Sequence, residues 1–395
     1  MDIEKIQKAI DDAGLSGWLF YDFHQRDPIS QRILGLDPEH IVTRRWYYYV
    51  PAHGEPKKLC HSMEPAILDH LPGSKVIYLR WQELRSGVKD MLEGARKIAM
   101  QFSEYNMIPY VSVVDAGTAD YIRSLGVEIE SSAELIGIFE SSFTTEELET
   151  HKEAYRTVLD AKDFGFKQIA DYLKKGENPT EFQIHKEISQ FLEDNDMTWD
   201  MGPIVSINEH NADPHFMPTG TNSMDIREGD LILFDIWAKK KAKGSIYADV
   251  TWMGFAGTEV PQKHEELFRI TCDARDAAVD LIRERFRKNI AIEGWEVDNA
   301  ARGVIEEAGY GKDFFHRTGH NIGEEVHGPG VHMDNLETRD ERKLIPGICF
   351  SIEPGIYLPE QKAGYRTEID VYITHERNVE IAGQVQQNII PILNL

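Results

Sequence analysis

The sequence predicts an α+β protein of two domains: a smaller α/β domain with a mixed sheet, then a larger domain whose strands are surrounded by helices. Strand-like and helical segments alternate through residues 1–142. A strong helix start at residues 143–148 then marks a domain boundary. Beyond it, long helical segments precede a C-terminal third that is rich in strands. The second domain is therefore predicted over residues 143–395.

Composition limits the classes of protein to which the chain can belong. Its 395 residues are enough for two hydrophobic cores, and a hydrophobic fraction of 41% argues against a disordered chain. The formal net charge of −24 disfavours nucleic acid or an anionic membrane as a partner, because both require a positive protein surface. No segment resembles a signal peptide or a membrane span. The three scattered cysteines exclude a disulfide framework, so we expect a cytoplasmic protein.

The first domain is predicted from its alternating segments. A helix over residues 2–14 ends at a glycine and is followed by an apolar strand at 17–21. Further strands are expected at residues 45–50, 76–79, 97–102 and 111–114. Further helices are expected at residues 64–70, 81–94 and 117–125. This alternation indicates a mixed sheet, and nothing in it resembles a glycine-rich phosphate-binding loop.

The helices of the second domain carry clear start signals. Thr144 and Glu147 have the spacing of a capping box, which predicts a helix that runs to about residue 175. Thr180 and Gln183 repeat the pattern and predict a helix that ends near residue 194. Two more helices are expected at residues 262–287 and 296–309.

Two predicted strands of the second domain run into carboxylates. Residues 231–235 place four apolar side chains before Asp235, and residues 246–251 carry Asp249 within a strand pattern. The alternation of side chains puts Asp249 and Thr251 on one face of their strand. Charges within apolar strands are costly unless they are paired or bound to a metal.

The C-terminal third adds further candidate ligands in apolar surroundings. Taken singly, each has an ordinary explanation: a salt-bridged strand residue, a turn residue or a surface histidine. Together, two aspartates, one histidine and two glutamates indicate one site, formed by Asp235, Asp249, His320, Glu353 and Glu368. Oxygen-rich ligation with a single imidazole suits Mn²⁺, Co²⁺, Fe²⁺ or Zn²⁺ in a two-metal arrangement.

The order and neighbours of these residues resemble the pita-bread metallopeptidases, specifically the Xaa-Pro aminopeptidase and prolidase branch. The matching motifs are Tyr-Ala-Asp249-Val-Thr, His316-x-x-Gly-His320-x-Ile-Gly-x-x-Val-His327, Glu353-Pro-Gly-Ile-Tyr and Gly-Tyr-Arg366-Thr-Glu368. The resemblance implies a pita-bread catalytic domain at residues 143–395 and a creatinase-like N-terminal domain at residues 1–142.

The resemblance implies hydrolysis of the peptide bond between an N-terminal residue and proline, with a metal-bridging hydroxide as nucleophile. Asp235 would chelate one metal ion. Asp249 and Glu368 would bridge the two ions, and His320 with Glu353 would hold the other. Two Mn²⁺ ions are the first expectation, with Co²⁺, Zn²⁺ or Fe²⁺ as alternatives.

Further roles follow from the same resemblance. Glu353 would act as the proton shuttle. His327 and His215 would contact the scissile carbonyl and the developing oxyanion. His316 would line the pocket for the proline ring.

Around the ligands, Arg366 would orient Glu368, and Thr251 would hydrogen-bond a metal carboxylate. The chain also departs from the family pattern. Asp235 and Asp249 are separated by more residues than is usual, and Trp237 stands where a glycine would be expected. This substitution suggests a reshaped or narrowed pocket.

Several alternatives stay open from the sequence. Cleavage of Xaa-Pro dipeptides and of longer peptides cannot be separated. The same fold and metal site could act on a non-peptide small molecule, as a hydrolase or a lyase, or the chain could be a catalytically dead peptide-binding module. The lysine-rich hairpin tip at residues 239–243 is either a solvated turn or a site for the substrate carboxylate. The resemblance also implies a homodimer.

Overall fold

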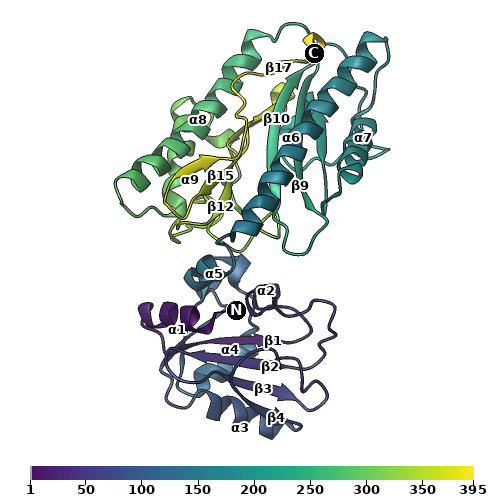
Figure 1. Cartoon of the computed structure of the whole chain (residues 1–395). Coiled ribbons are helices and arrows are strands. Elements are labelled where there is room, and N and C mark those ends of the chain that lie inside the picture. Colours follow the sequence, from purple (N-terminus) through teal and green to yellow (C-terminus); the bar gives the residue numbers. More distant parts are fainter. Residues whose placement is uncertain (1) are drawn as a thin grey trace. The chain divides into compact units, whose positions relative to one another are not determined.

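The computed structural model describes residues 2–395, which form two compact units. The first unit ends at Glu140, and the second comprises Ser141–Leu395. Figure 1 shows helices and strands in both units, and each unit is described here by itself.

The first unit contains a six-stranded mixed sheet, as the alternating pattern predicted. In spatial order its strands are β4 (Ser74–Tyr78), β3 (Lys57–His61), β2 (Trp46–Pro51), β1 (Gly17–Asp22), β5 (Lys97–Met100) and β6 (Glu128–Ser131). The central strand β1 is antiparallel to β2 and parallel to β5. Its helices are α1 (Ile3–Asp12), α2 (Pro28–Leu34), α3 (Trp81–Met91), α4 (Ala116–Ser124) and α5 (Ala133–Phe139). The sequence prediction did not include α2, α5, β3 and β6.

Two predicted elements of this unit are wrong. Residues 64–70 form turns and not a helix. The Lys58 ammonium group donates to the carbonyls of Leu68 and Leu71, at 3.3 and 2.6 Å, and so holds the end of this turn segment against strand β3. The predicted strand at residues 111–114 is also absent, because a short 3₁₀ turn at Pro109–Val111 occupies its start.

The second unit has long helices, of which the first two begin where the capping patterns predicted. They are α6 (Thr145–Lys174), α7 (Glu181–Asp194), α8 (Gln262–Arg287) and α9 (Gly294–Glu307). The Thr144 hydroxyl accepts a hydrogen bond from the Glu147 backbone, and the Glu147 side chain accepts one from the Thr144 backbone. This reciprocal pair satisfies two backbone donors at the start of α6.

Two sheets and a hairpin make up the β structure of this unit. The first sheet has the order β17 (Ile390–Pro391), β10 (Ala248–Phe255), β9 (Leu231–Lys240) and β7 (Met197–Thr198), with β8 (Ile204–Ile207) also paired to β9. The second has the order β11 (Asn321–Ile322), β12 (Cys349–Ile352), β15 (Ile369–Ile373) and β16 (Val379–Ile381). Strands β13 (Gly355–Leu358) and β14 (Ala363–Arg366) form a separate hairpin.

Helix α6 covers one face of strands β9 and β10, and the C-terminal strands β14 and β15 also contact β10. Helix α6 packs against β9 and β10 through a core that includes Phe166 and Phe234, whose ring centroids lie 4.3 Å apart. Helices α8 and α9 contribute to a second core with the C-terminal strands. Figure 1 shows α6 on one side of these strands and α8 with α9 on the other. Charged side chains within β9 and β10 are therefore held in apolar surroundings. Across residues 2–395, no helix combines the length and apolarity that crossing a membrane requires.

Candidate metal centre

The antiparallel pair β9 and β10 brings the two aspartates of the predicted site together. In the register of this pair, Asp235 lies opposite Thr251, and Asp249 lies opposite Trp237. Asp235 is 9% exposed and Asp249 is 4% exposed. A two-residue offset across the ladder therefore places both carboxylates on the same face of the sheet.

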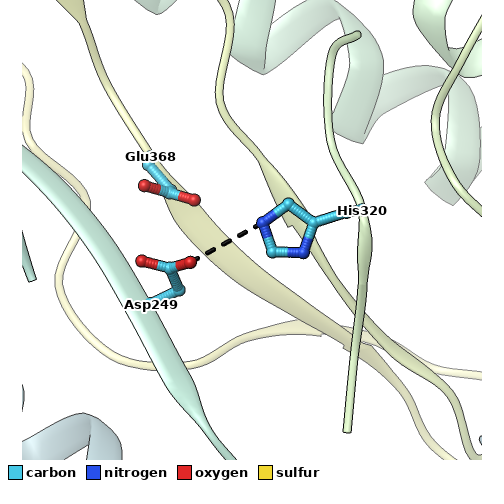
Figure 2. A group of neighbouring side chains, drawn as sticks. All are labelled: Asp249, His320 and Glu368. Atoms are coloured by element: carbon cyan, nitrogen blue, oxygen red, sulfur yellow. Dashed lines mark ion pairs between the residues drawn. The ribbon is translucent and has the colours of Figure 1, made fainter. Parts of the chain in front are cut away.

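Three of the predicted ligands form a compact group. Ligand atoms of Asp249, His320 and Glu368 all lie within 4.8 Å of one another, and all three residues are buried. Figure 2 shows the two carboxylates close together, with one imidazole nitrogen of His320 directed at Asp249. Such a group can supply both oxygen and nitrogen ligands to one ion.

The imidazole of His320 also reaches a fourth predicted ligand. Its Nε2 lies 3.6 Å from Oδ2 of Asp249 and 3.4 Å from Oε1 of Glu353. The Ser351 hydroxyl accepts a hydrogen bond from the His320 backbone at 3.0 Å and donates one to Glu353 at 3.2 Å. A Cβ at Gly319 would lie 1.9 Å from the Ser351 carbonyl oxygen, so only glycine permits this close approach of the two segments.

Arg366 and Thr251 connect the remaining carboxylates. The Arg366 guanidinium donates to Oδ2 of Asp235, and its Nε donates to the Thr251 hydroxyl at 2.9 Å. That hydroxyl donates in turn to Oε2 of Glu368 at 2.8 Å. Arg366 therefore acts on Glu368 through Thr251, while it pairs directly with Asp235.

The electrostatics of the group follow from burial and from the crowding of like charges. Burial, followed by the charges of Glu368 and Asp235, raises the pKa of Asp249 well above its ordinary value. Burial raises the pKa of Glu353 to about 7, against the lowering effect of the Arg366 charge. Burial lowers the pKa of His320 well below its ordinary value, which keeps the imidazole neutral and able to bind a metal.

These residues fit a divalent cation. The Oδ1 atom of Asp249 is buried and has no hydrogen-bond partner in the part of the chain that the structure describes. A buried carboxylate oxygen without a partner is costly unless a cation binds it. Four carboxylates and one neutral imidazole are a donor set typical of Mn²⁺, Co²⁺ or Zn²⁺.

The five predicted ligands line a single cavity of about 680 Å³. Its wall also includes His215, His327, Arg366 and Trp237. The rings of His320 and His327 meet edge to face, with centroids 4.2 Å apart. His215 and His327 are both exposed to solvent, as donors to a bound substrate must be.

His316 lies elsewhere. The residues that line the cavity do not include it, and its Nε2 is 2.7 Å from the Tyr357 hydroxyl. Arg366 Nη1 donates to the same hydroxyl at 3.3 Å. The structure thus places His316 beside Tyr357 and outside the lining of this cavity, and its role at the proline ring stays a prediction.

Trp237 is fixed at the edge of the cavity by two neighbours. Its indole N–H donates to Oδ1 of Asp200 at 2.8 Å. Against the six-membered part of the ring is Gly202, which has φ of +89° and whose Cβ, if present, would lie 2.6 Å from the indole. The bulky residue in place of the expected glycine is therefore a fixed wall of the cavity.

The sequence did not assign a role to four residues that support the site. They are Ser351, Tyr357, Asp370 and Asp200. Tyr357 belongs to the Glu353-Pro-Gly-Ile-Tyr motif, and Asp370 shares the strand alternation of Glu368, so both carried a local signal. Asp200 carried none, because an acidic residue in a loop is usually a solvated surface group.

The lysines of the hairpin tip form other contacts. Lys240 pairs with Glu153 at 2.6 Å, and Lys241 pairs with Glu193 at 2.5 Å. The Lys239 ammonium donates to the Glu324 carbonyl at 2.5 Å. None of these three lysines is among the residues that line the cavity, which favours the interpretation of the tip as a surface turn.

Comparisons with known proteins agree with this arrangement. The model of metallopeptidase family M24 matches residues 153–375. The Xaa-Pro dipeptidase of Lactobacillus delbrueckii subsp. lactis is 31% identical over 206 residues, which cover 52% of this chain and 51% of the relative. The putative dipeptidase YkvY of Bacillus subtilis is 28% identical over 266 residues, or 67% of each chain. The chain thus spans about half the length of the first of these curated relatives.

The solved structures extend the likeness to the whole chain. The crystal structure of dipeptidase PepE from Mycobacterium ulcerans superimposes with a TM-score of 0.70 and 22% identity, over 98% of this chain and 96% of that one. This likeness confirms the expected α+β fold, a pita-bread domain preceded by a smaller domain.

Proposed function

Because the chain belongs to metallopeptidase family M24, we propose that it hydrolyses the peptide bond between an N-terminal residue and proline, with two divalent ions as cofactors. The observation that carries this proposal is the convergence of five ligand side chains in one cavity, with Oδ1 of Asp249 buried and otherwise unpartnered within residues 2–395. The dipeptidase names of the relatives support a dipeptide as substrate.

The ligand roles follow the expectation from the motifs. Asp235 would hold one ion, Asp249 and Glu368 would bridge, and His320 with Glu353 would hold the other. Bound there, divalent ions would supply Lewis acidity and lower the pKa of water enough to provide a nucleophile near neutral pH. Mn²⁺ is the ion we propose first.

The chain's own residues would manage the proton and the charge on the substrate. The carboxyl of Glu353 lies in the cavity wall beside the other proposed ligands and would accept a proton from the attacking water and release it again. It would pass the proton to the proline nitrogen, which has no N–H of its own in the peptide bond. The imidazoles of His215 and His327 line the same cavity and would donate to the substrate carbonyl oxygen.

Supporting residues would keep this arrangement rigid. Arg366 fixes Asp235 directly and fixes Glu368 through Thr251. Ser351 holds the segments of His320 and Glu353 together. Such contacts set the orientation of metal ligands and their basicity.

The proposal includes a homodimer in the cytoplasm. All three cysteines are unpaired and buried, which is consistent with a reducing compartment. Light scattering of the purified protein tests the oligomeric state.

The test of the function combines metal analysis with two peptides. The purified full chain should retain about two divalent ions per molecule and hydrolyse Ala-Pro in the presence of Mn²⁺. Chelation should abolish hydrolysis, and added Mn²⁺ should restore it. A parallel assay with Ala-Pro-Ala distinguishes a dipeptidase from an aminopeptidase for longer peptides. A protein that binds no ion, or that leaves both peptides intact with Mn²⁺, Co²⁺ and Zn²⁺, would overturn the proposal.

A further inference from the structure

We propose that Asp200 selects substrates whose first residue carries a positive side chain, lysine or arginine. This inference rests on the proposed peptidase function and names the substrate class of the same cavity. The wall of this cavity is strongly acidic. Five acidic residues line the cavity, and Asp200 is the one that is not a proposed metal ligand.

The charge of Asp200 is not balanced by the protein. Arg366 is the cationic residue in the cavity wall, and it pairs with Asp235. The Oδ1 atom of Asp200 accepts hydrogen bonds from the Trp237 indole and from the Met201 backbone, both at 2.8 Å. Within residues 2–395, Asp200 forms no ion pair. These neutral donors fix the carboxylate in place and leave Oδ2 for a ligand.

The position of Asp200 indicates which part of a substrate it meets. Asp200 is exposed, whereas Asp249 and Glu368 are buried at 4% and 2% exposure. The α-nitrogen of a substrate is two bonds from the carbon under attack, so it must lie at the buried ligands. Asp200 lies outside the group formed by the buried ligands Asp249, His320 and Glu368, so a side chain would extend to it from the α-carbon on a stem, such as the four-carbon chain of lysine.

The wall beside Asp200 suits such a stem. Met201, Met217 and Trp237 line the cavity and offer thioether and aromatic surface to methylene groups. The indole of Trp237 contacts both Asp200 and Gly202, and the face of a tryptophan attracts ammonium and guanidinium groups. A fixed carboxylate beside a fixed aromatic ring is thus a site for an alkyl cation.

The test compares two dipeptides that differ only in the charge. Lys-Pro and norleucyl-proline have first residues with the same four-carbon stem, and norleucine lacks the ammonium group. We expect the Mn²⁺-loaded protein to show kcat/KM about 2- to 5-fold higher for Lys-Pro, the range of an ion pair with an exposed carboxylate. Asp200→Asn should bring this ratio close to one. Asp200→Lys should reverse the preference toward Glu-Pro.

A matched control separates a local contact from general attraction. Asp196→Asn also removes one exposed carboxylate, four positions along the chain and outside the cavity wall, and asparagine tolerates its φ of +61°. The ratio of Lys-Pro to norleucyl-proline should be unchanged in this variant. Equal losses of the ratio in the two asparagine variants, or a wild-type ratio near one, would overturn the inference.

Failure of the proposed peptidase function can be distinguished from failure of the cation site at Asp200. If the wild-type protein cleaves neither dipeptide, the proposed function fails, and calorimetric titration with the same dipeptides then decides the role of Asp200. Tighter binding of Lys-Pro than of norleucyl-proline, lost in Asp200→Asn, would support the cation site. Equal dissociation constants would overturn it.

Discussion

The backbone N–H of Asp249 donates a hydrogen bond to Oδ2 of Asp370, at 3.0 Å. Asp370 is fully buried, and the Nε2 atom of His151 lies 3.8 Å from the same oxygen. Asp249, the proposed bridging ligand, is therefore positioned by Asp370, which does not itself line the cavity. Contacts of this kind commonly decide how tightly a metal is held.

We predict that Asp370→Ala weakens metal binding. The change removes the acceptor of the Asp249 backbone N–H, so the ligand loses its fixed orientation. Affinity for Mn²⁺ should fall about 10- to 100-fold, measured by titration of the metal-free protein. Asp370→Asn keeps an acceptor oxygen and should lose much less affinity. Equal losses of Mn²⁺ affinity in the two variants would show that this hydrogen bond does not determine metal binding.

The second prediction concerns the stability of the metal-free protein as pH changes. Burial raises the pKa of Glu353 from 4.5 to about 7 in the folded state. The folded state therefore holds this proton more tightly than the unfolded state does. The resulting stabilisation is complete below pH 4.5 and is lost as pH rises through about 7.

Glu353→Gln removes this titration. In the presence of chelator, the difference in Tm between the variant and the wild type should therefore shift in favour of the variant between pH 5 and pH 8. Glu360→Gln removes an exposed carboxylate and is the control for the loss of a charge. A difference that stays constant from pH 5 to pH 8 for Glu353→Gln would contradict the assignment of a raised pKa.

Replacement of Arg366 should destabilise the protein. Arg366 is 3% exposed and pairs with Asp235, so Arg366→Met leaves that carboxylate buried without its cation. Loss of one partner of a buried pair costs about 3–5 kcal/mol of unfolding free energy. Urea denaturation of the metal-free protein measures the loss.

Arg227→Met is the matched control for this experiment. Arg227 pairs with Asp225 at the surface, where the two side chains are 66% and 49% exposed. Such a pair contributes about 0–1 kcal/mol. If the two variants lost similar free energy, the Arg366–Asp235 pair would not be a determinant of stability.

The hairpin lysines should not affect substrate binding. Lys240 and Lys241 pair with Glu153 and Glu193, away from the cavity wall. We expect the double variant Lys240→Ser and Lys241→Ser to keep the wild-type KM for Ala-Pro within about twofold, since surface ion pairs contribute little. A selective rise in KM for the dipeptide, with KM for Ala-Pro-Ala unchanged, would instead place the substrate carboxylate at the hairpin.

Local signals in the sequence predicted much of the fold. The start of α6 follows from contacts between residues three positions apart, Thr144 and Glu147, and such contacts can be inferred from spacing. The turns at residues 64–70 were predicted as a helix, and the Leu68 carbonyl within them accepts from Lys58, ten positions earlier in the chain. Contacts beyond the spacing of a helical turn can override local propensity, and no local pattern reports them.

The residues of the site also fall into those with a local sequence signal and those that depend on tertiary contacts. Asp235 and Asp249 were recognisable because each interrupts an apolar strand. The support by Asp370 and the contact between Asp200 and Trp237 depend on pairings across 121 and 37 positions of the chain. The contact of His316 with the Tyr357 hydroxyl, 41 positions away, is likewise a tertiary effect.

Gly202 and Trp237 form a steric pair whose members constrain each other's evolution. The backbone at Gly202 is left-handed, and even a methyl group there would collide with the indole. A homologue with an alanine at the first position should therefore have lost the aromatic ring at the second. Covariation of these two columns in an alignment would identify the relatives that share this pocket wall, and with it their choice of substrate.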